Sequence, residues 1–333
     1  MTDPLDIIFS PAQVARAGTA YIEARALNKT EGIPFYLPAM DEKLLPLLPG
    51  ELLTIIGRPG AGKSAVMLHW ARQRARHLQV SSILDRVVVY ITYEMHCEEL
   101  YALHVASEVG IPVDAMARGN LDEGQLELIR GYGVRRAAVP LWLIGHSQER
   151  RKKRPNINLS SVIESLWRVE NWEEEGKRDL KIDMIFVDYL QRIPFEGHPE
   201  SKVIGIDENL NKLKDIGLLF SCPVVCGVQA RREVDDKNPQ VPELNDGQWS
   251  SSTEQVSDKV LSVVRPIKYV NKEGDMFGKM MVQGRNQMLL CILKQKLGDC
   301  PWVIWTLFNP QYNQMVEAEV KNYDLNKMAG RDY

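Results

Sequence analysis

The residues from Gly57 to Ser64 have the types and the spacing of a phosphate-binding loop. They match the pattern Gly-x-x-x-x-Gly-Lys-Ser/Thr at every fixed position. In such a loop, backbone N–H groups surround phosphate oxygens at a helix N-terminus, where the helix dipole favours anions. Lys63 would then reach the β- and γ-phosphates of a nucleotide, and the Ser64 hydroxyl would bind Mg²⁺. The predicted loop comprises Gly57, Arg58, Pro59, Gly60, Ala61, Gly62, Lys63 and Ser64.

The sequence on both sides of this loop supports the match. An apolar run at 52–56 predicts a buried strand before the loop, and residues 64–72 have a helical pattern after it. The alternative is a chance glycine-rich turn, which would require neither the strand nor the helix. The sequence therefore favours a nucleotide site.

A carboxylate for the metal ion follows a second apolar run. Asp188 comes directly after residues 184–187, which is the Walker B pattern of an apolar strand that ends in an acid. This position would bring Asp188 close to Ser64 and the Mg²⁺. Asp183 begins the same strand and would lie at its other end. In the alternative interpretation, Asp188 only caps its strand.

Two more polar side chains follow predicted strands. Glu94 ends the run that begins at Tyr90, and Gln229 ends the run 224–228. Because the carboxyl ends of parallel strands meet at one edge of a sheet, we expect both side chains near the phosphate loop. Glu94 could polarise the water that attacks a γ-phosphate, and the amide of Gln229 could sense that phosphate. The alternative is that both are solvated side chains at strand ends.

The elements that position these residues alternate between apolar strands and amphipathic helices. This alternation predicts an α/β fold with a mostly parallel sheet flanked by helices, and continuous Val/Ile/Leu runs suit strands that are buried on both faces. Shorter strands after residue 255 are expected to add to the same sheet, some of them antiparallel. The predicted strands are 52–56, 87–91, 141–144, 184–187, 224–228, 259–264, 289–294 and 303–308.

Composition limits the class of protein. The 333 residues are 44% hydrophobic and 26% charged, which is ordinary for a globular protein. No apolar run approaches the ~20 residues of a membrane span, and the acidic N-terminus is unlike a signal peptide, so we expect a soluble, cytoplasmic protein without a membrane partner. The net charge of −3 provides no general attraction for nucleic acid. The five cysteines are expected to be buried thiols rather than metal ligands or disulfides.

The motifs together resemble the C-terminal motor domain of the DnaB-type replicative helicases, a branch of the RecA-like P-loop ATPases. The likeness runs from residue 32 to about residue 320. Glu94-Met95 and Asp188-Tyr189-Leu190-Gln191 are specific to that branch, whereas the phosphate loop alone is not. The matching segments are Gly32-Ile33-Pro34, 48–52, 57–59, Glu94-Met95, 187–191, 223–225, Glu254-Gln255 with Asp258, Lys294-Gln295 and Phe308-Asn309-Pro310.

The resemblance implies specific roles at the nucleotide site. It implies that ATP and Mg²⁺ are the cofactors, with Lys63 and Ser64 on the phosphates and the metal and Asp188 on the metal. It makes Glu94 the catalytic base and Gln229 the relay between nucleotide and DNA. The loops after Asp188 and Gln229 would line a central channel that holds single-stranded DNA. In this chain those loops carry Arg192, Lys202, Arg231, Arg232 and Lys237, which in the alternative interpretation are solvated surface cations.

The chain departs from this family at a second catalytic group. The family provides a finger to the neighbouring subunit from a Lys-x-Arg pair, but this chain has Lys294-Gln295-Lys296. Recombinases of the RecA type use paired lysines in this way, so the resemblance implies that Lys294 and Lys296 act in trans. Lysine lacks the planar fork of arginine, and a finger can change the rate by ~10³–10⁵, so ATP turnover is expected to be slower or differently controlled.

We expect three segments. Residues 1–32 form an arm with a helix that starts near Ser10-Pro11, residues 33–320 form the RecA-like motor domain, and residues 321–333 form a polar tail. The family's N-terminal domain of roughly a hundred residues has no counterpart before the arm. A collar with primase docking is therefore not expected.

The predicted function is an ATP-hydrolysing, DnaB-like helicase that forms a homo-oligomeric ring, most simply a hexamer, on single-stranded DNA or RNA. A loader or a replication or mobile-element protein would be its partner. The alternative is an ATPase that binds nucleic acid without unwinding it, such as a recombination mediator, a transposition regulator or a defence component. A third class is a signalling ATPase ring that binds no nucleic acid.

Overall fold

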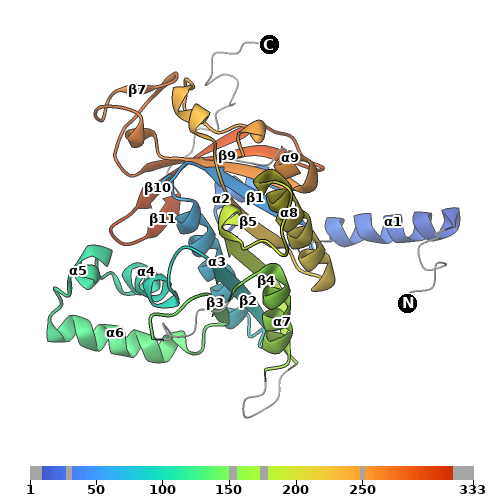
Figure 1. Ribbon diagram of the computed structural model, residues 1–333, viewed down its shortest axis with the longest axis horizontal. Coiled ribbons are helices and arrows are strands. Elements are labelled where there is room, and N and C mark those ends of the chain that lie inside the picture. The colour runs from blue at the N-terminus through green and yellow to red at the C-terminus, as the bar shows by residue number, and fades with distance from the viewer. Residues whose placement is uncertain (1–9, 28–31, 150–155, 173–178, 248–251, 318–333) are drawn as a thin grey trace. The chain divides into compact units, whose positions relative to one another are not determined.

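The computed structural model describes residues 10–27, 32–149, 156–172, 179–247 and 252–317 (Figure 1). The chain divides into two compact units, Met1–Ile33 and Pro34–Tyr333. The predicted C-terminal tail, 321–333, lies outside the described residues. None of the described helices combines the length and the apolar character that are needed to span a lipid bilayer.

The first unit contains the predicted arm helix, α1 (Pro11–Ala26). Its first turn is capped reciprocally by two side chains: the backbone N–H of Gln13 donates to Ser10 Oγ, and the backbone N–H of Ser10 donates to Gln13 Oε1. Val14 and Tyr21, on the predicted apolar stripe, are exposed. The capping therefore supports this helix, and burial of its own apolar face contributes little.

The second unit is built on one sheet of nine strands in the order β11-β10-β9-β6-β1-β5-β4-β2-β3. The six strands from β6 to β3 are parallel, and β9, β10 and β11 add to the β6 edge as antiparallel strands. Their bounds are β1 (Leu52–Gly57), β2 (Arg86–Thr92), β3 (Leu141–Ile144), β4 (Lys181–Asp188), β5 (Val224–Gln229), β6 (Lys259–Val264), β9 (Gln287–Gln295), β10 (Trp302–Asn309) and β11 (Gln314–Glu317).

The predicted α/β fold and all eight predicted strands are confirmed. Of the strands after residue 255, β6 pairs in parallel with β1, whereas β9 and β10 are antiparallel to their neighbours. The sequence analysis missed β11 and the small hairpin of β7 (Met276–Phe277) and β8 (Met280–Met281). These strands are short, and their sequences carry little periodic signal.

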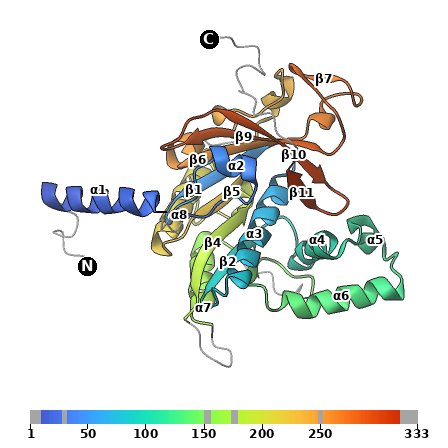
Figure 2. The same cartoon turned by 180° about the vertical axis from the view of Figure 1, so that it is seen from behind.

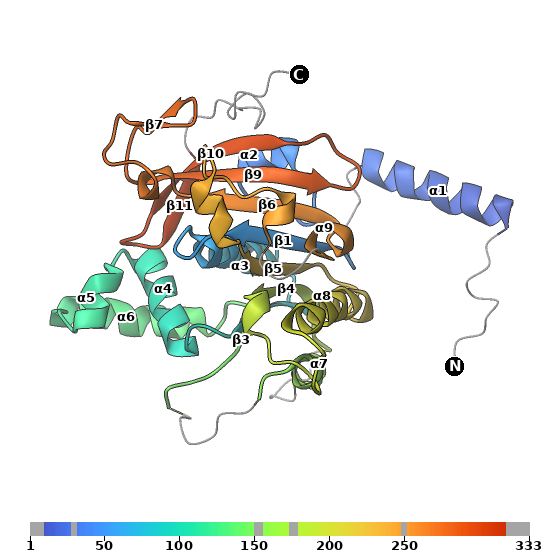
Figure 3. The same ribbon diagram turned by 45° about the horizontal axis from the view of Figure 1, so that its top comes forward.

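Helices cover both faces of the sheet, as Figures 2 and 3 show. On one face, α7 and α8 bury Leu166, Leu210 and Leu213 against strand residues that include Leu52 and Ile56. On the other face lies α3, whose Trp70 packs edge-on against Phe186 of β4. The bounds are α2 (Pro38–Lys43), α3 (Lys63–Val80), α7 (Leu159–Glu170), α8 (Lys202–Leu219) and α9 (Ser252–Val256).

Three further helices form a helical insertion between β2 and β3: α4 (Cys97–Val109), α5 (Val113–Arg118) and α6 (Glu123–Arg136). They share a small core of their own made by Val105, Ile111 and Tyr132. In Figure 1 the insertion lies to one side of the sheet, next to α3. The sequence analysis did not identify these helices.

The cysteine prediction is confirmed in part. All five thiols are free, and Cys222, Cys226 and Cys291 are buried, whereas Cys97 and Cys300 are half-buried. Within the described residues no group of three or more His, Cys, Asp or Glu side chains could hold a metal ion.

Candidate functional site

A pocket of about 320 Å³ lies at the carboxyl ends of β1 and β5. The strand register creates it, because Gly57 at the end of β1 pairs with Gln229 at the end of β5, and Thr92 of β2 pairs with Asp188 of β4. The phosphate loop, Glu94 and Gln229 were predicted to meet here, and the structure brings them together. The lining residues are Pro59, Gly60, Gly62, Lys63, Ser64, Ala65, Glu94, Tyr189, Gln229 and Phe308.

The backbone of the loop depends on glycine at the start of α3. Gly62, which precedes the first helical residue, has φ +107°, a left-handed conformation that side chains disfavour. A Cβ at this position would also collide with Cε of Met288 on β9. The loop can therefore turn into the helix only with glycine here.

Lys63 lies inside the loop with only 8% of its surface exposed. Its Nζ donates hydrogen bonds to the backbone oxygens of Gly57 at 2.8 Å and Arg58 at 3.4 Å. Burial lowers the pKa of Lys63 to about 8, although the nearby carboxylates of Asp188 and Glu94 act in the opposite direction. The ammonium group is thus held where it would meet phosphate oxygens, in surroundings that stabilise its charge poorly.

Asp188 is the last residue of β4, lies beside Ser64 and Lys63, and is 1% exposed. The hydroxyl of Tyr90 donates to its Oδ2 at 3.0 Å, whereas its Oδ1 has no hydrogen-bond partner among the described residues. Burial raises the pKa of Asp188, and the hydroxyls of Ser64 and Tyr90 and the charge of Lys63 lower it in part. An unpaired buried carboxylate oxygen next to a serine hydroxyl fits Mg²⁺, which commonly takes one or two carboxylates together with substrate phosphates.

Asp183 has a separate role at the other end of β4. Its carboxylate is buried and accepts two hydrogen bonds from Arg74 of α3, at 2.6 Å from Nε and 2.8 Å from Nη2. Arg74 also donates to the hydroxyl of Tyr36. This paired acid fastens α3 to the sheet, so Asp188 is the acid of β4 that lies beside Ser64 and Lys63.

The side chains of Glu94 and Gln229 reach the pocket from neighbouring strand ends. Glu94 is exposed, two residues beyond the end of β2, and faces the same cavity as Lys63. The backbone N–H of Gln229 donates to Oε1 of Gln191 at 3.0 Å. This bond joins the end of β5 to the turn that follows Asp188, so the two loops predicted to contact DNA are mechanically connected.

Lys268 is a second lysine at the loop, and the sequence analysis missed it. Its Nζ donates to the backbone oxygen of Pro59 at 3.0 Å. Burial and the neighbouring charges of Arg265 and Arg58 lower its pKa. No motif marks this residue, because it lies in a short 3₁₀ turn after β6 and reaches the loop only through the fold.

Arg58 is the loop residue whose charge is already balanced. Its guanidinium donates to both carboxylate oxygens of Asp235, with the shortest contact at 2.8 Å from Nη2 to Oδ2, and to the backbone oxygen of Ala230 at 3.1 Å. These contacts tie the phosphate loop to the segment after Gln229. Arg58 thus has a structural role in the loop as described.

Lys294 and Lys296 lie at the end of the sheet where β1 and β6 begin, opposite to the end that carries the phosphate loop. β9 runs antiparallel to β6, so Gln295 pairs with Lys259, which itself pairs with Leu53 at the start of β1. Lys294 donates to the backbone oxygens of Glu254 at 2.5 Å and Ser257 at 2.8 Å. Lys296 is 70% exposed, with its Nζ 3.7 Å from Oδ1 of Asp258. Neither lysine can act at the pocket of its own chain.

The predicted DNA-contact cations differ in their surroundings. Arg192 and Lys202 are exposed, as are Arg231 and Arg232, and they lie in or after the loops that follow β4 and β5. Lys237 instead pairs with two carboxylates, at 3.1 Å from Glu243 and 2.6 Å from Asp246. The position of Lys237 therefore favours a structural ion pair over a DNA contact.

The fold and the site define a P-loop protein of the nucleotide-binding α/β class. Comparison with known families then identifies the branch: residues 32–317 match the model of the DnaB-like helicase C terminal domain. The chain belongs to this family.

Similar proteins agree with this assignment. The chain is 26% identical over 254 residues to a probable plasmid replicative DNA helicase of Chlamydia muridarum, which covers 76% of this chain and 51% of that protein. It is 24% identical over 306 residues to the replicative DNA helicase DnaB of Rickettsia bellii, which covers 87% of this chain and 58% of that protein. The chain thus spans about half the length of such relatives.

Solved structures show the same fold. A solved ATPase domain superposes with a TM-score of 0.74 at 18% identity, over 93% of this chain and 100% of that chain. A DnaB-like replicative helicase, described with its interactions with primase, gives a TM-score of 0.74 at 17% identity, over 92% of this chain and 67% of that chain. The predicted RecA-like motor fold is confirmed.

The lowered pKa of Lys63 predicts that ATP affinity depends on pH. Bound phosphates would restore the proton of Lys63, so in the free protein its loss above pH 8 should weaken binding. We expect a constant Kd below about pH 8 and roughly a tenfold rise per pH unit above it. Titration with a fluorescent ATP analogue across this range measures the effect. The Lys63→Met variant should bind weakly with no such inflection, and a flat wild-type profile would contradict the prediction.

Proposed function

We propose that this protein is an ATP-hydrolysing, DnaB-like helicase that moves along single-stranded DNA as a ring of identical subunits. The observation that carries the proposal is the separation of charged groups between the two ends of the parallel strands. Lys63, Asp188 and Glu94 gather at one end, and Lys296 lies at the other. Such a division suits a site that is completed by a neighbouring copy.

Each side chain in the pocket has a role in this proposal. Lys63 exchanges its bonds to Gly57 and Arg58 for bonds to phosphate oxygens, and Ser64 and Asp188 hold Mg²⁺. The metal ion, when bound, neutralises charge on the transferring phosphate. Glu94 faces the cavity from across the loop, where it can accept a proton from the attacking water. Gln229 couples the γ-phosphate to the adjacent turn through its bond to Gln191.

The trans-acting group in this proposal is Lys296, with Lys294 beside it. Lys296 is the better placed of the two, because it is 70% exposed, whereas Lys294 is held by two backbone oxygens. In a closed ring the exposed edge of one subunit meets the pocket of the next, as head-to-tail interfaces require. The family membership supports a ring, for which six subunits are proposed.

The exposed arginines give the proposal its nucleic-acid surface. Arg192, Arg231 and Arg232 lie just beyond the strand ends that form the pocket. Their guanidinium groups suit contacts to backbone phosphates without sequence preference. The bond between Gln229 and Gln191 connects this surface to the pocket, so hydrolysis and DNA contact can be coupled.

The partners and location of the protein follow from the same proposal. One structural relative is described with its interactions with primase, and relatives of this chain are named replicative or plasmid replicative helicases. A loader or another replication protein is therefore the proposed protein partner. The proposed location is the cytoplasm.

The first prediction of this proposal concerns the base. Glu94→Gln keeps the shape of the side chain but removes its basicity, so ATPase turnover should fall by about 10²–10⁴ while ATP binding persists. Turnover is measured with and without single-stranded DNA, and unwinding with a forked duplex. The wild type should show stimulated turnover and strand displacement.

Each contrary outcome identifies a different error. Normal turnover by Glu94→Gln would remove Glu94 from the mechanism. Stimulated turnover without strand displacement would instead favour the non-unwinding ATPase. If wild-type turnover does not change when DNA is added, both the helicase and the non-unwinding nucleic-acid-binding ATPase are excluded.

The second prediction concerns sharing of the site between subunits. Rings made only of Lys296→Ala or only of Glu94→Gln should be nearly inactive, because every site lacks one group. In rings assembled from equal amounts of the two variants, roughly a quarter of the sites combine an intact Glu94 from one subunit with an intact Lys296 from the next. Activity should therefore recover in part. Steady-state turnover of the mixture measures this recovery. If the mixture is no more active than its components, Lys296 does not act in trans.

The third prediction concerns the DNA surface. The double variant Arg231→Ala and Arg232→Ala should weaken single-strand binding and reduce the slope of log K against log salt by about one to two, because each lost phosphate contact removes about one counterion. Fluorescence anisotropy at several salt concentrations measures the slope. Arg118→Ala, which changes a side chain 68% exposed on the helical insertion, is the matched control and should leave it unchanged.

A further inference from the structure

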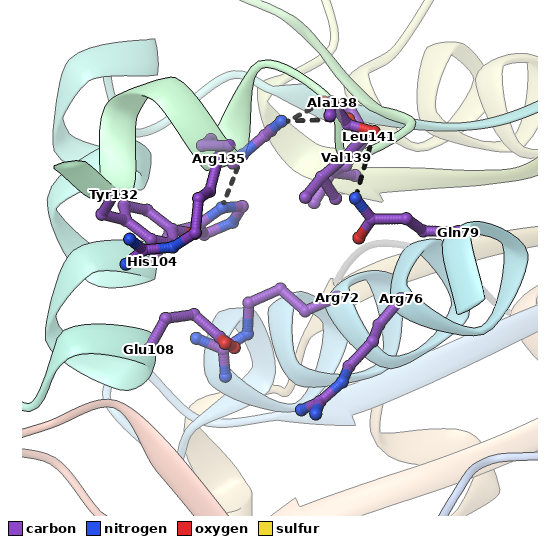
Figure 4. Close-up of a pocket in the computed structure, with 11 residues that line it drawn as sticks. Arg72, Arg76, Gln79, His104, Glu108, Tyr132, Arg135, Ala138, Val139 and Leu141 are labelled. Carbon is purple, nitrogen blue, oxygen red and sulfur yellow. Dashed lines mark hydrogen bonds between the residues drawn. The ribbon is translucent and has the colours of Figure 1, made fainter.

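A second pocket, of about 370 Å³, lies between α3 and the helical insertion, away from the phosphate loop. Figure 4 shows Arg72 and Arg76 on α3 facing His104 and Glu108 on α4. Lys63 is the first residue of α3 and Arg72 lies nine residues further on, a rise of about 13 Å along the helix. The two pockets are therefore distinct.

The second pocket has a strong excess of positive charge. Four guanidinium groups line it, from Arg72, Arg76, Arg135 and Arg136, against the single carboxylate of Glu108. Arg76 and Arg135 are exposed and make no side-chain hydrogen bond or ion pair within the described part of the chain. Two planar forks are thus available for an anion, which guanidinium groups recognise through paired hydrogen bonds.

Arg136 is the member of this set that holds the pocket together. It donates to the backbone oxygens of Val139 at 3.2 Å and Leu141 at 2.7 Å, and through Nε to Nδ1 of His104 at 3.4 Å. Because Nδ1 of His104 accepts this bond, its neutral ring carries its proton on Nε2. Burial, together with the charges of Arg72 and Arg136, lowers the pKa of His104, which keeps the ring neutral.

Two buried donors of this pocket have no partner. They are Nε2 of His104, a residue only 1% exposed, and Nη1 of Arg72, a residue 9% exposed, and neither has a hydrogen-bond acceptor among the described residues. The other terminal nitrogen of Arg72 is fixed, since it donates to the backbone oxygen of Asn313 at 3.2 Å. Buried donors without acceptors are costly, so a site that gathers two of them beside free arginines is suited to an oxyanion.

We propose that this pocket binds a small phosphorylated organic molecule. A phosphate group carries about −1.5 to −2 charges at neutral pH and has three acceptor oxygens. It therefore suits a site with several guanidinium groups better than a ligand carboxylate would. The cavity lies within the range of roughly 300–1,000 Å³ that is typical of small-ligand sites and exceeds the needs of a bare phosphate. Tyr132, Val139 and Leu141 supply an apolar wall for the organic part.

Phenyl phosphate is a suitable probe, because it combines a phosphate monoester with a ring for the apolar wall. It is titrated calorimetrically into the full chain while a non-hydrolysable ATP analogue with Mg²⁺ saturates the phosphate loop. We expect saturable binding to one site per chain. The double variant Arg76→Gln and Arg135→Gln should weaken it about tenfold to a hundredfold, which corresponds to the loss of charge-assisted hydrogen bonds.

Two further variants provide controls, one expected to have no effect and one expected to tighten binding. Arg130→Gln removes a charge from the same helix, α6, at a residue 65% exposed and paired with Glu123, and it should leave binding unchanged. Glu108→Gln removes the one carboxylate that faces the pocket and should tighten binding.

Several results would overturn the proposal. The proposal would be wrong if phenyl phosphate showed no saturable binding, or if its affinity were the same in the Arg76→Gln and Arg135→Gln double variant. It would also be wrong if benzoate bound equally well, because the site would then select a carboxylate. Competition by a short single-stranded DNA that depends on the same arginines would also overturn it, in favour of a DNA backbone contact.

Discussion

The parallel register of the central strands is the constraint on which the site depends. Gly57 lies opposite Gln229, and Thr92 lies opposite Asp188, so residues distant in sequence end their strands at one edge. A slip of one residue would turn every side chain of a strand to the other face of the sheet. The register is fixed because all six residues of β1 are buried, and both of its faces pack against helices.

Burial of the site disfavours the charged forms of its ionisable side chains when no ligand is bound. It lowers the pKa of Lys63 and raises that of Asp188, so the protein environment disfavours the charged form of both groups. Their mutual attraction offsets this only in part. A polyanion paired with a divalent cation would supply the opposite charge that each group lacks.

The sequence predicts the parts of this structure whose signal is local. The runs 52–56 and 224–228 are almost entirely apolar, and the phosphate loop is a contiguous motif, so each could be predicted from neighbouring residues. The helical insertion could not, because α6 buries only Tyr132 and so has almost no apolar stripe. Lys268 and the ion pairs of Lys237 depend on segments brought together by folding, and no spacing in the sequence indicates them.

The cations at the phosphate loop already have hydrogen-bond partners within their own chain. Lys63 is bound to Gly57, Arg58 is bound to Asp235, and Lys268 is bound to Pro59. Without ligand, each of these side chains donates its hydrogen bonds to a neighbouring group. A cation can therefore contact a phosphate only where phosphate oxygens replace those bonds. β9 places Lys294 level with Thr54 of β1, about 10 Å before Gly57 along the strand direction, and Lys296 lies beyond it toward the start of β1. The exposed Lys296 at that end of the strands fits the proposal that another subunit supplies further positive charge to the site.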